Sequence, residues 1–411
     1  MRGKADSDLV RRQNRMLVLE TLRFHGPSAR VDIGRLTGLS PATITTITLQ
    51  LLQEGAIVER ADLAATAGEG RRGRPVVSLG LNAEAAFLIA IKISIGTLEY
   101  ALADYAGQIR ARANVTVPTR RLSAQDFSKR LVFETQKFVR DNVITRNQLA
   151  QINVAAQGVT DNVNGAVGWS PAFRVSGVAI TGPLADAFGV PCTLANDANM
   201  IAEGLIARKA VATHGTTACV FMGYGIGMGL VIDGAVYHGT SGSSGEFGHM
   251  NHIPSGALCR CGRRGCLEAY ASDYGILRSA ENLPDDTPCP THAVEPEVMI
   301  ALENAARRGD QNAVAAFKTA GAAIGLGLAR MIALLNPDRI VLSGAGTRAL
   351  DLIEPAIREA IELSVAEPLR QNLVIETLPI DRDMIIDGTI DAALRQMDAG
   401  LYATTQAMAA E

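Results

Sequence analysis

The sequence is poor in aromatic residues and has no long apolar run. Aromatic residues make up 4% of its 411 positions, with a single tryptophan. A membrane-spanning helix needs a run of about 18 apolar residues, and none occurs. The start, MRGKADSDLVRRQ, also lacks the apolar core of a signal peptide. We therefore expect a cytoplasmic protein without membrane insertion.

Cysteine is scarce as well, with 6 residues in the whole chain. Three of them stand within one short segment, at positions 259, 261 and 266. This clustering favours a metal site in a reducing compartment over a disulfide framework. We expect the other three to be small buried hydrophobic residues: Cys192, Cys219 and Cys289.

Charge is divided unevenly along the chain, and only its N-terminal part has a net positive charge. Residues 1–80 hold 12 Lys and Arg against 8 Asp and Glu, a net charge of +4, whereas the remainder carries −7. A chain of this length with 47% hydrophobic residues also exceeds one small core, so we expect two or three folded units. The basic N-terminal unit is the expected anion-binding part.

The N-terminal unit has the pattern of a helix-turn-helix. Apolar residues at helical spacing predict helices over residues 15–26 and 31–37, with a turn at Gly38. A third helix follows, with Ser40 as its N-cap and Pro41 at its first position. The cap and the exposed early residues of this helix are the predicted DNA contacts: Ser40, Thr43, Thr45 and Thr46. Three ordinary bundle helices are the alternative.

A basic loop follows the three helices. After a predicted strand at residues 56–60 comes ATAGEGRRGRPVVSLGLN, which places three arginines on a Gly/Pro frame before a second strand: Arg71, Arg72 and Arg74. This pattern predicts a winged helix whose arginines enter a narrow, A·T-rich minor groove. A solvated charged linker would have the same composition and stays open as the alternative.

The remaining chain alternates apolar runs with amphipathic stretches such as Asn312 to Leu335. This alternation predicts an α/β fold with mixed sheets. Within it, GYGIGMG at residues 223–229 is typical of a hairpin whose backbone approaches a phosphate, and a tight structural hairpin would explain it equally well.

Four segments together resemble the ROK family of repressors, open reading frames and sugar kinases. They are LANDANMIAEG (194–204), GYGIGMGLVIDG (223–234), GEFGHMNHIPSGALCRCGRRGCLEAYAS (245–272) and NPDRIVLSGAG (336–346). The N-terminal pattern ending in RRGRP resembles the repressor branch. The resemblance implies an α/β protein with a winged helix-turn-helix over 1–80 and a two-lobed, actin-like (ribonuclease H-like) sugar-binding domain over 81–411. It also implies lobes divided near residue 195 and a C-terminal helix that returns to the first lobe.

The cysteine-rich segment supplies one imidazole and three thiolates: His249, Cys259, Cys261 and Cys266. This is a closed tetrahedral set for one structural Zn2+ per chain, with no open position to activate water. His252 competes with His249 as the fourth ligand, and the family match falls on His249.

The resemblance places five residues on the hydroxyls of a sugar in the cleft between the lobes: Asn196, Asp197, Glu246, His249 and Glu268. A carboxylate can accept two hydroxyl protons, and a metal-bound His still presents its second ring nitrogen. Ala172 stands where the family often has Asn after Ser-Pro, so we expect one hydroxyl contact to be missing.

The phosphate-binding motif of the family's kinases is broken in this chain. Its Asp-Ile-Gly-Gly-Thr aligns with residues 92–96, so that Lys92 replaces Asp and side chains replace both glycines, and Tyr224 replaces the usual Thr of the second phosphate loop. Asp197 stands where the kinases keep a base, but a base without a positioned phosphate transfers nothing.

We therefore expect a transcriptional repressor that is not an enzyme. It would bind double-stranded operator DNA as a homodimer or homotetramer and respond to a small-molecule sugar, most simply at genes of carbohydrate uptake or catabolism. The alternatives are a sugar kinase fused to a DNA-binding domain and a repressor controlled by a protein partner instead of a sugar.

Overall fold

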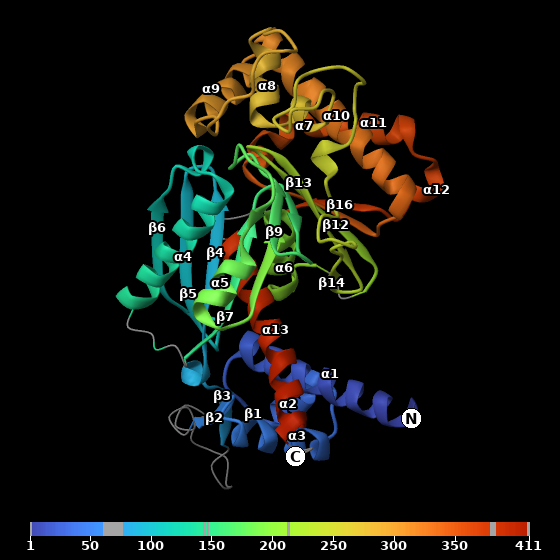
Figure 1. Ribbon diagram of the computed structural model, residues 1–411. Coiled ribbons are helices and arrows are strands. Elements are labelled where there is room, and N and C mark those ends of the chain that lie inside the picture. Colours follow the sequence, from blue (N-terminus) through green and yellow to red (C-terminus); the bar gives the residue numbers. More distant parts are fainter. Residues whose placement is uncertain are drawn as a thin grey trace.

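The computed structural model describes residues 2–60, 77–142, 145, 148–211, 214–378 and 384–408. Figure 1 shows an N-terminal head below two larger lobes. We use "head" for residues 2–60 and 77–81, "first lobe" for residues 87–196, and "second lobe" for the described residues of 214–378. The mixed α/β class predicted from the sequence is confirmed.

Three helices and a small sheet form the head. The helices are α1 (Arg2–His25), α2 (Arg30–Thr37) and α3 (Pro41–Gln53), and the antiparallel strands are β1 (Ser28–Ala29), β2 (Ile57–Arg60) and β3 (Ser78–Leu81). α1 begins well before the predicted helix. The sequence pattern does not predict β1, because two residues are too few to show an alternation.

The core of the head continues into the first lobe. Val18, Leu19 and Ile44 belong to one buried cluster together with Leu88 of the first lobe and Ile390 near the C-terminus. The head is therefore attached to the first lobe and to the C-terminal segment through shared apolar packing. Because this core is closely packed, a movement of either of these parts also displaces the helices of the head.

A five-stranded sheet with the order β11-β7-β4-β5-β6 forms the first lobe. β4 pairs with β7 in parallel and with β5 in antiparallel orientation. Ile89 and Ile91 of β4 face the cluster under α4 and α5, whereas Leu88 and Ala90 face the cluster shared with the head. The elements are β4 (Phe87–Ser94), β5 (Thr97–Asp104), β6 (Ile109–Thr116), α4 (Ala124–Asp141), β7 (Leu149–Ala156), β8 (Val159–Asp161), β9 (Ala166–Trp169), β10 (Val178–Ala179), α5 (Thr181–Phe188) and β11 (Cys192–Asn196).

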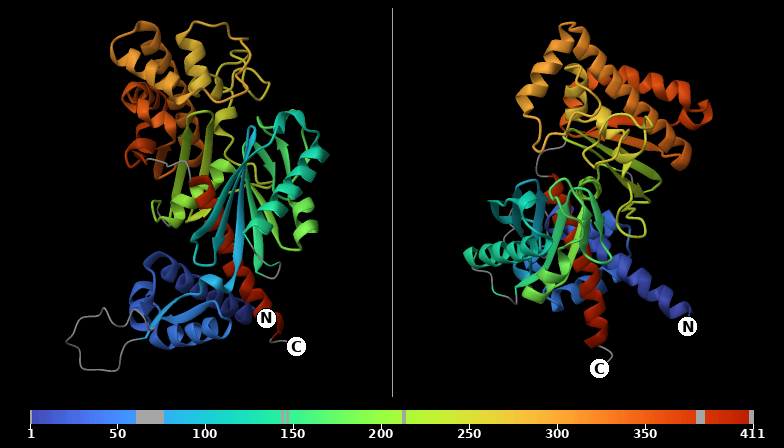
Figure 2. Two further views of the ribbon diagram at one scale, coloured as in Figure 1. Left: turned by 90° about the vertical axis from the view of Figure 1, so that its left-hand side faces the viewer. Right: turned by 45° about the horizontal axis from the view of Figure 1, so that its top comes forward.

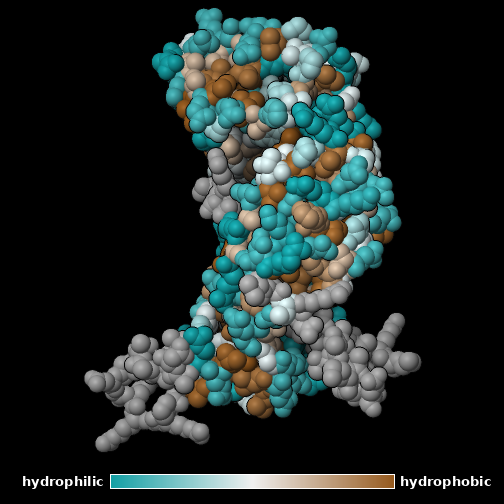
Figure 3. Space-filling view, turned by 60° about the vertical axis from the view of Figure 1, so that its left-hand side comes forward, coloured by the Kyte–Doolittle hydropathy of each residue, from teal (hydrophilic) through white to brown (hydrophobic). Residues whose placement is uncertain are grey.

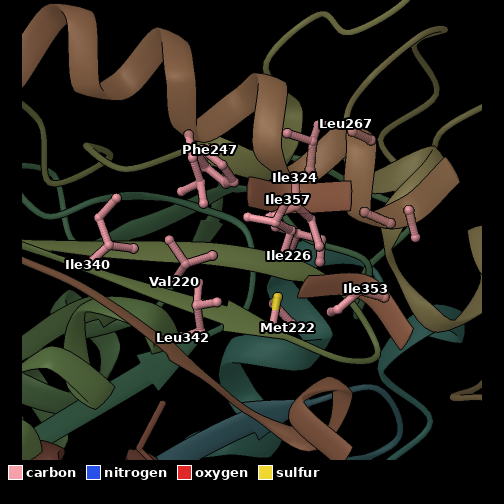
Figure 4. Packing of buried hydrophobic residues seen from close by; sticks show 14 of the residues in the cluster. Val220, Met222, Ile226, Phe247, Leu267, Ile324, Ile340, Leu342, Ile353 and Ile357 are labelled. Atoms are coloured by element: carbon pink, nitrogen blue, oxygen red, sulfur yellow. The ribbon is translucent and has the colours of Figure 1, made fainter. Parts of the chain in front are cut away.

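A second five-stranded sheet, with the order β14-β13-β12-β15-β16, forms the second lobe with its helices. Figure 4 shows how Ile324 and Ile357 from the helices meet Val220, Ile340 and Leu342 from the strands. The elements are β12 (Thr216–Met222), β13 (Ile226–Ile232), β14 (Ala235–Val236), α7 (Glu268–Ala271), α8 (Asp273–Ala280), α9 (Pro296–Arg307), α10 (Gln311–Leu335), β15 (Arg339–Ser343), α11 (Leu350–Ser364), α12 (Glu367–Arg370) and β16 (Val374–Thr377).

α10 is long and apolar enough to cross a membrane by length and composition. However, 56% of its most apolar window is buried inside the protein, where Ala320, Ile324 and Leu328 are fully covered. It packs along α11 and α8. These contacts are those of a core helix, and they account for its composition without a membrane.

Two helices join the parts of the molecule. α6 (Asp197–Ala207) leaves the first lobe directly after β11, and α13 (Met384–Met408) contacts α6, β4, β7 and α1. Figures 1 and 2 show α13 running from between the lobes down to the head. The surface view in Figure 3 shows a largely hydrophilic face with apolar patches on the head and on the lobes above it.

Candidate functional site

The predicted metal ligands lie together in the second lobe. One ligand atom from each of four residues falls within 4.8 Å of the others: His249, Cys259, Cys261 and Cys266. The Cys259 Sγ to His249 Nδ1 distance and the Cys261 Sγ to Cys266 Sγ distance are both 3.7 Å. A tetrahedral ion with bonds of about 2.3 Å to sulfur needs ligand separations of roughly 3.8 Å. The cluster therefore has the size and donors that Zn2+ prefers.

Short backbone hydrogen bonds hold the cysteine loop in shape. Cys259 N donates to Arg263 O at 2.8 Å, and Gly262 N donates to Cys259 O at 2.9 Å. His252, the competing ligand, lies outside the cluster, since its ring packs edge-on against Tyr270 with centroids 5.1 Å apart. The geometry therefore favours His249.

The isolated cysteines differ in their burial. Cys219 is buried, as predicted, in a cluster between α6 and β13. Cys192 and Cys289 are only partly buried, so the prediction of full burial is wrong for these two. Cys289 lies with its sulfur 3.4 Å from Leu258 O, at the margin of the cysteine loop.

A cleft of about 690 Å3, including its solvent-open part, lies between the lobes, and all five predicted sugar ligands line it. Asn196 and Asp197 come from the junction of β11 and α6, and Glu246, His249 and Glu268 come from the second lobe.

The junction of β11 and α6 is held by its own cap. Asn196 Oδ1 accepts from Ala198 N at 2.8 Å, and Asn196 Nδ2 donates to Gly158 O at 2.7 Å. One N–H of this amide is thus left for a ligand. Asp197 begins the helix, and burial raises the pKa of its carboxyl to about 6.

On the opposite side, two buried apolar residues anchor the polar ones. Phe247 and Leu267 are buried in the core of the second lobe, as Figure 4 shows, and each lies beside a cleft carboxylate in the sequence. Burial of these anchors fixes where Glu246 and Glu268 can point. Glu268 is further held by Ile226 N, which donates to its Oε2 at 3.2 Å.

The two ring nitrogens of His249 lie in different places, one in the cysteine cluster and one at the cleft. Its Nδ1 lies in the cysteine cluster, whereas its Nε2 lies 3.8 Å from Glu246 Oε2 at the cleft. Burial also raises the pKa of the Glu246 and Glu268 carboxyls. Three carboxyl groups thus share one partly desolvated cleft, an arrangement suited to accepting hydrogen bonds from the hydroxyls of a polyol.

Sequence reasoning missed other residues of the cleft. Trp169 lines it and packs edge-on against the His249 ring at 5.4 Å; its being the single tryptophan of the chain was the available signal. Arg260, inside the cysteine motif, also lines the cleft. Ala172 does not belong to the lining and is fully buried in the core of the first lobe.

The region that aligns with the kinase phosphate motif is occupied by other interactions. Lys92 Nζ donates to Glu99 Oε1 at 2.8 Å, which engages the lysine within the first lobe. Gly229, in the glycine-rich hairpin, faces α6, where an added Cβ would lie 2.8 Å from Ala198 O. At this position glycine lets the helix pack directly on β13, which is neither the phosphate contact nor the tight hairpin considered from the sequence.

The predicted DNA contacts of the head lie at the start of α3. Ser40 Oγ accepts from Thr43 N at 3.2 Å, which caps the helix as predicted. Thr45 and Thr46 are exposed, and their hydroxyls donate to the carbonyls four residues earlier. The three wing arginines fall outside the described residues: Arg71, Arg72 and Arg74.

Comparisons with known proteins agree with these features over nearly the whole chain. The sequence is 28% identical to the DNA-binding transcriptional repressor Mlc of Escherichia coli over 398 residues, which covers 95% of this chain and 94% of Mlc. It is 27% identical to the transcriptional dual regulator NagC of the same organism, covering 91% and 90% of the two chains. A xylose repressor of Bacillus spizizenii is 25% identical over 362 residues, 88% of this chain and 89% of the repressor. These relatives are described as transcriptional repressors or regulators.

Solved structures extend the comparison to the fold. A ROK family transcriptional regulator described as a homolog of E. coli Mlc matches with a TM-score of 0.75 at 25% identity, covering 96% of this chain and 98% of the regulator. A ROK family glucokinase from Streptomyces griseus matches with a TM-score of 0.58 at 23% identity, covering 75% of this chain and 99% of the kinase, and shares the fold. The ROK family pattern itself matches residues 88–384, and the chain belongs to the ROK family.

Proposed function

We propose that this protein is a cytoplasmic, sugar-responsive transcriptional repressor. Residues 1–80 would form the operator-binding domain, and residues 81–411 would form the two-lobed sugar-binding domain. The main observation in support of the proposal is that one chain contains both a capped helix-turn-helix head and a cleft lined by three carboxylates. Two or more copies of the chain would place paired heads on a pseudo-palindromic operator, because one recognition helix reads few base pairs.

The sugar would bind between the lobes. Asp197, Glu246 and Glu268 would accept hydrogen bonds from its hydroxyls, Asn196 would donate a hydrogen bond from its free N–H, and His249 would contribute Nε2. Because these groups come from both lobes, a bound sugar favours the conformation in which the lobes are closest.

Zinc would be structural in this protein. Held by His249 and the three cysteines, it supplies rigidity to the loop that carries Glu246 and leads to Glu268. The chain's own residues then orient the carboxylates through the buried anchors Phe247 and Leu267.

α6 offers a route from the sugar to the DNA. Its first residue, Asp197, lies in the cleft, and the rest of the helix is buried against α13 and β13. At the far end Arg208 pairs with Asp387 of α13 at 2.6 Å. A shift of the helix at the cleft is therefore passed to α13, since a closely packed helix moves as a unit.

Both helices reach the head. Lys209, just beyond α6, places Nζ 4.0 Å from the ring centroid of Phe24 on α1. Asp398 of α13 pairs with Arg23 of α1 at 2.9 Å and accepts from Tyr105 Oη at 2.7 Å. Closure of the lobes would thus alter the angle of α1 and the spacing of paired recognition helices.

The test is operator binding measured with and without a panel of hexoses, pentoses, amino sugars and polyols. If the proposal is correct, one sugar changes the operator affinity, and the protein consumes no ATP with any sugar of the panel. Turnover of ATP would favour the kinase alternative. Binding to DNA with no response to any sugar would favour control by a protein partner.

A further inference from the structure

A loop of the second lobe reaches the first lobe beside the cleft. This loop, residues 237–245, connects the edge strand β14 to Glu246, and we call it the strap. One of its ends lies at the cleft, since Gly245 and Glu246 both belong to the cleft lining. The other end follows Val236 of β14, which lines a second cavity together with Phe24 of α1. The strap therefore runs from the cleft to a cavity beside the head, and the function proposed above does not use it.

The strap is fixed to the second lobe at both ends. Tyr237 N donates to Leu230 O of β13 at 2.7 Å. At the other end Gly245 has a φ of +83°, and an added Cβ would lie 2.2 Å from Met228 O, so only glycine lets the chain lie this close to β13. Within the strap, Ser244 Oγ donates to Tyr237 O. The strap therefore moves with the second lobe as a unit.

The strap meets the β8–β9 hairpin of the first lobe. Asp161 closes the turn of this hairpin, because its Oδ1 accepts from Val163 N at 3.1 Å and from Asn164 N at 3.0 Å. Val167 of β9 is buried in the core of the first lobe, which fixes the hairpin to that lobe. At the base of the hairpin Trp169 lines the cleft. The hairpin therefore moves with the first lobe.

Two hydrogen bonds join the strap to the hairpin. Asn162 N donates to Ser241 O at 2.8 Å, and Ser243 Oγ donates to Thr160 O. Gly242 packs against the Asn162 side chain, where an added Cβ would lie 2.1 Å from Cγ. Because each partner is fixed to its own lobe, this contact forms only when the two lobes are close together.

The hydrogen bonding at this contact is incomplete. Three polar side-chain atoms there are buried without a hydrogen-bond partner among the described residues: Thr160 Oγ1, Asn162 Oδ1 and His238 Nδ1. Water would reach these atoms if the lobes separated, so their burial offsets part of what the two hydrogen bonds contribute. The contact is therefore weak enough to open and close reversibly.

We propose that the strap and the hairpin form a latch, which holds the lobes together beside the cleft and thereby sets how tightly the protein binds its effector. A bound sugar and the latch favour the same closed conformation, so each strengthens the other. Residues 241–243, which make the contact, do not belong to the cleft lining, so the latch acts without touching the sugar. The inference rests on the proposed function, since the latch acts on the closure of the same lobes.

The first test compares two adjacent serines in the full-length protein without sugar. Ser243→Ala removes the hydrogen bond to the hairpin, whereas Ser244→Ala removes one within the strap and is the matched control. Hydrogen–deuterium exchange over residues 159–164, which include the latch amide of Asn162, should be roughly 2- to 10-fold faster in Ser243→Ala and unchanged in Ser244→Ala. Equal exchange in the two variants would overturn the latch.

The second test is calorimetric titration with glucose, xylose, N-acetylglucosamine and sorbitol, one member of each class in the panel. Ser243→Ala should bind the effective sugar roughly 2- to 10-fold more weakly than the wild type, and Ser244→Ala should bind it equally well. Gly242→Ala should lose at least as much affinity, because its Cβ displaces the Asn162 side chain. Gly177→Ala is its control, since Gly177 also has a positive φ, of +68°, but an added Cβ there meets nothing within 4 Å.

The outcomes separate the two proposals. If no sugar of the panel binds the wild-type protein, the proposed function fails, and the latch fails with it as a control of effector affinity. If a sugar binds the wild type and Ser243→Ala equally tightly, only the latch fails. Thermal denaturation and zinc content check that each variant is folded.

Discussion

The crossing of α6 and α13 gives the most direct test of how the cleft controls the head. At this crossing Gly388 of α13 lies against α6, and an added Cβ would meet Met200 O at 1.7 Å and Gly204 N at 2.9 Å. These are backbone atoms and cannot rotate away. In Gly388→Ala, α13 must therefore move from α6 by roughly 1.5 Å to reach an ordinary C···O separation of about 3.3 Å.

The size of the effect follows from this geometry. Overpacking of a buried contact costs about 1–3 kcal/mol of unfolding free energy, so the variant should fold with reduced stability. Coupling between two sites is typically about 1–3 kcal/mol, which corresponds to roughly 5- to 150-fold in affinity. If α6 transmits closure through its packing on α13, Gly388→Ala should lose most of this factor, and saturating sugar should hardly change operator affinity.

The assay is fluorescence anisotropy with labelled operator at zero and saturating sugar, alongside thermal denaturation. Gly182→Ala in α5 is the matched control, because an added Cβ there meets nothing within 4 Å, and it should respond to sugar like the wild type. Phe24→Ala is a milder variant that removes the Lys209 contact from a half-exposed ring. A destabilised Gly388→Ala that keeps the full sugar response would refute the α6 route.

Four further outcomes are expected. Cys261→Ser should lose the single zinc measured by elemental analysis and weaken sugar binding, and chelation should lower the Tm of the wild type; full zinc content in the variant would exclude Cys261 as a ligand. Arg72→Ala and Arg74→Ala should reduce the slope of the logarithm of operator affinity against the logarithm of salt concentration by about 0.9 for each phosphate that is no longer neutralised. An unchanged slope would favour the alternative that this loop is a solvated linker. Asp197→Ala and Glu246→Ala should bind operator normally but lose sugar affinity at least about tenfold, since removal of a charged hydrogen bond costs about 1.5–3 kcal/mol; a wild-type response would place the sensing site elsewhere. Sugar affinity of the wild type should fall as the pH drops through about 6, where Asp197 takes up a proton, and titrations at pH 5 and 7.5 measure this.

The Asp197 pKa also fixes the sign of a stability effect. Its pKa in the folded protein lies above the ordinary 3.8, so the folded state binds the proton more tightly than the unfolded chain. This carboxyl therefore destabilises the fold above a pH of about 6, and the penalty is relieved as the pH falls toward 4. Sugar affinity and this contribution to stability thus change in opposite directions with pH.

Local signals in the sequence were sufficient for the head and the metal cluster. The Ser40 cap, the turn at Gly38 and the apolar spacing act over a few residues, and the structure confirms the helices that they predict. The cysteine motif likewise brings three ligands together through one loop. His249 needed the family pattern, because spacing alone did not separate it from His252.

Arg260 was missed for a different reason. Its environment consists of Tyr224 and Tyr274, which are respectively 36 and 14 positions away and meet it only in the folded second lobe. An arginine between two cysteines of this motif is expected, from the sequence alone, to be an exposed loop residue like Arg263. Only tertiary contacts distinguish the stacked cation from its exposed neighbour.

Two residues in the segments that align with the phosphate motifs of the family's kinases make other contacts in this chain. Lys92 pairs with Glu99 where the kinases have the Asp of their phosphate motif, and the ring of Tyr224 stacks on Arg260 in the second phosphate loop. Asp197 begins α6, and Lys209, just beyond the end of that helix, contacts Phe24 of the head. Under the proposed function, the binding energy of the sugar would be available to shift the equilibrium between two conformations of the head.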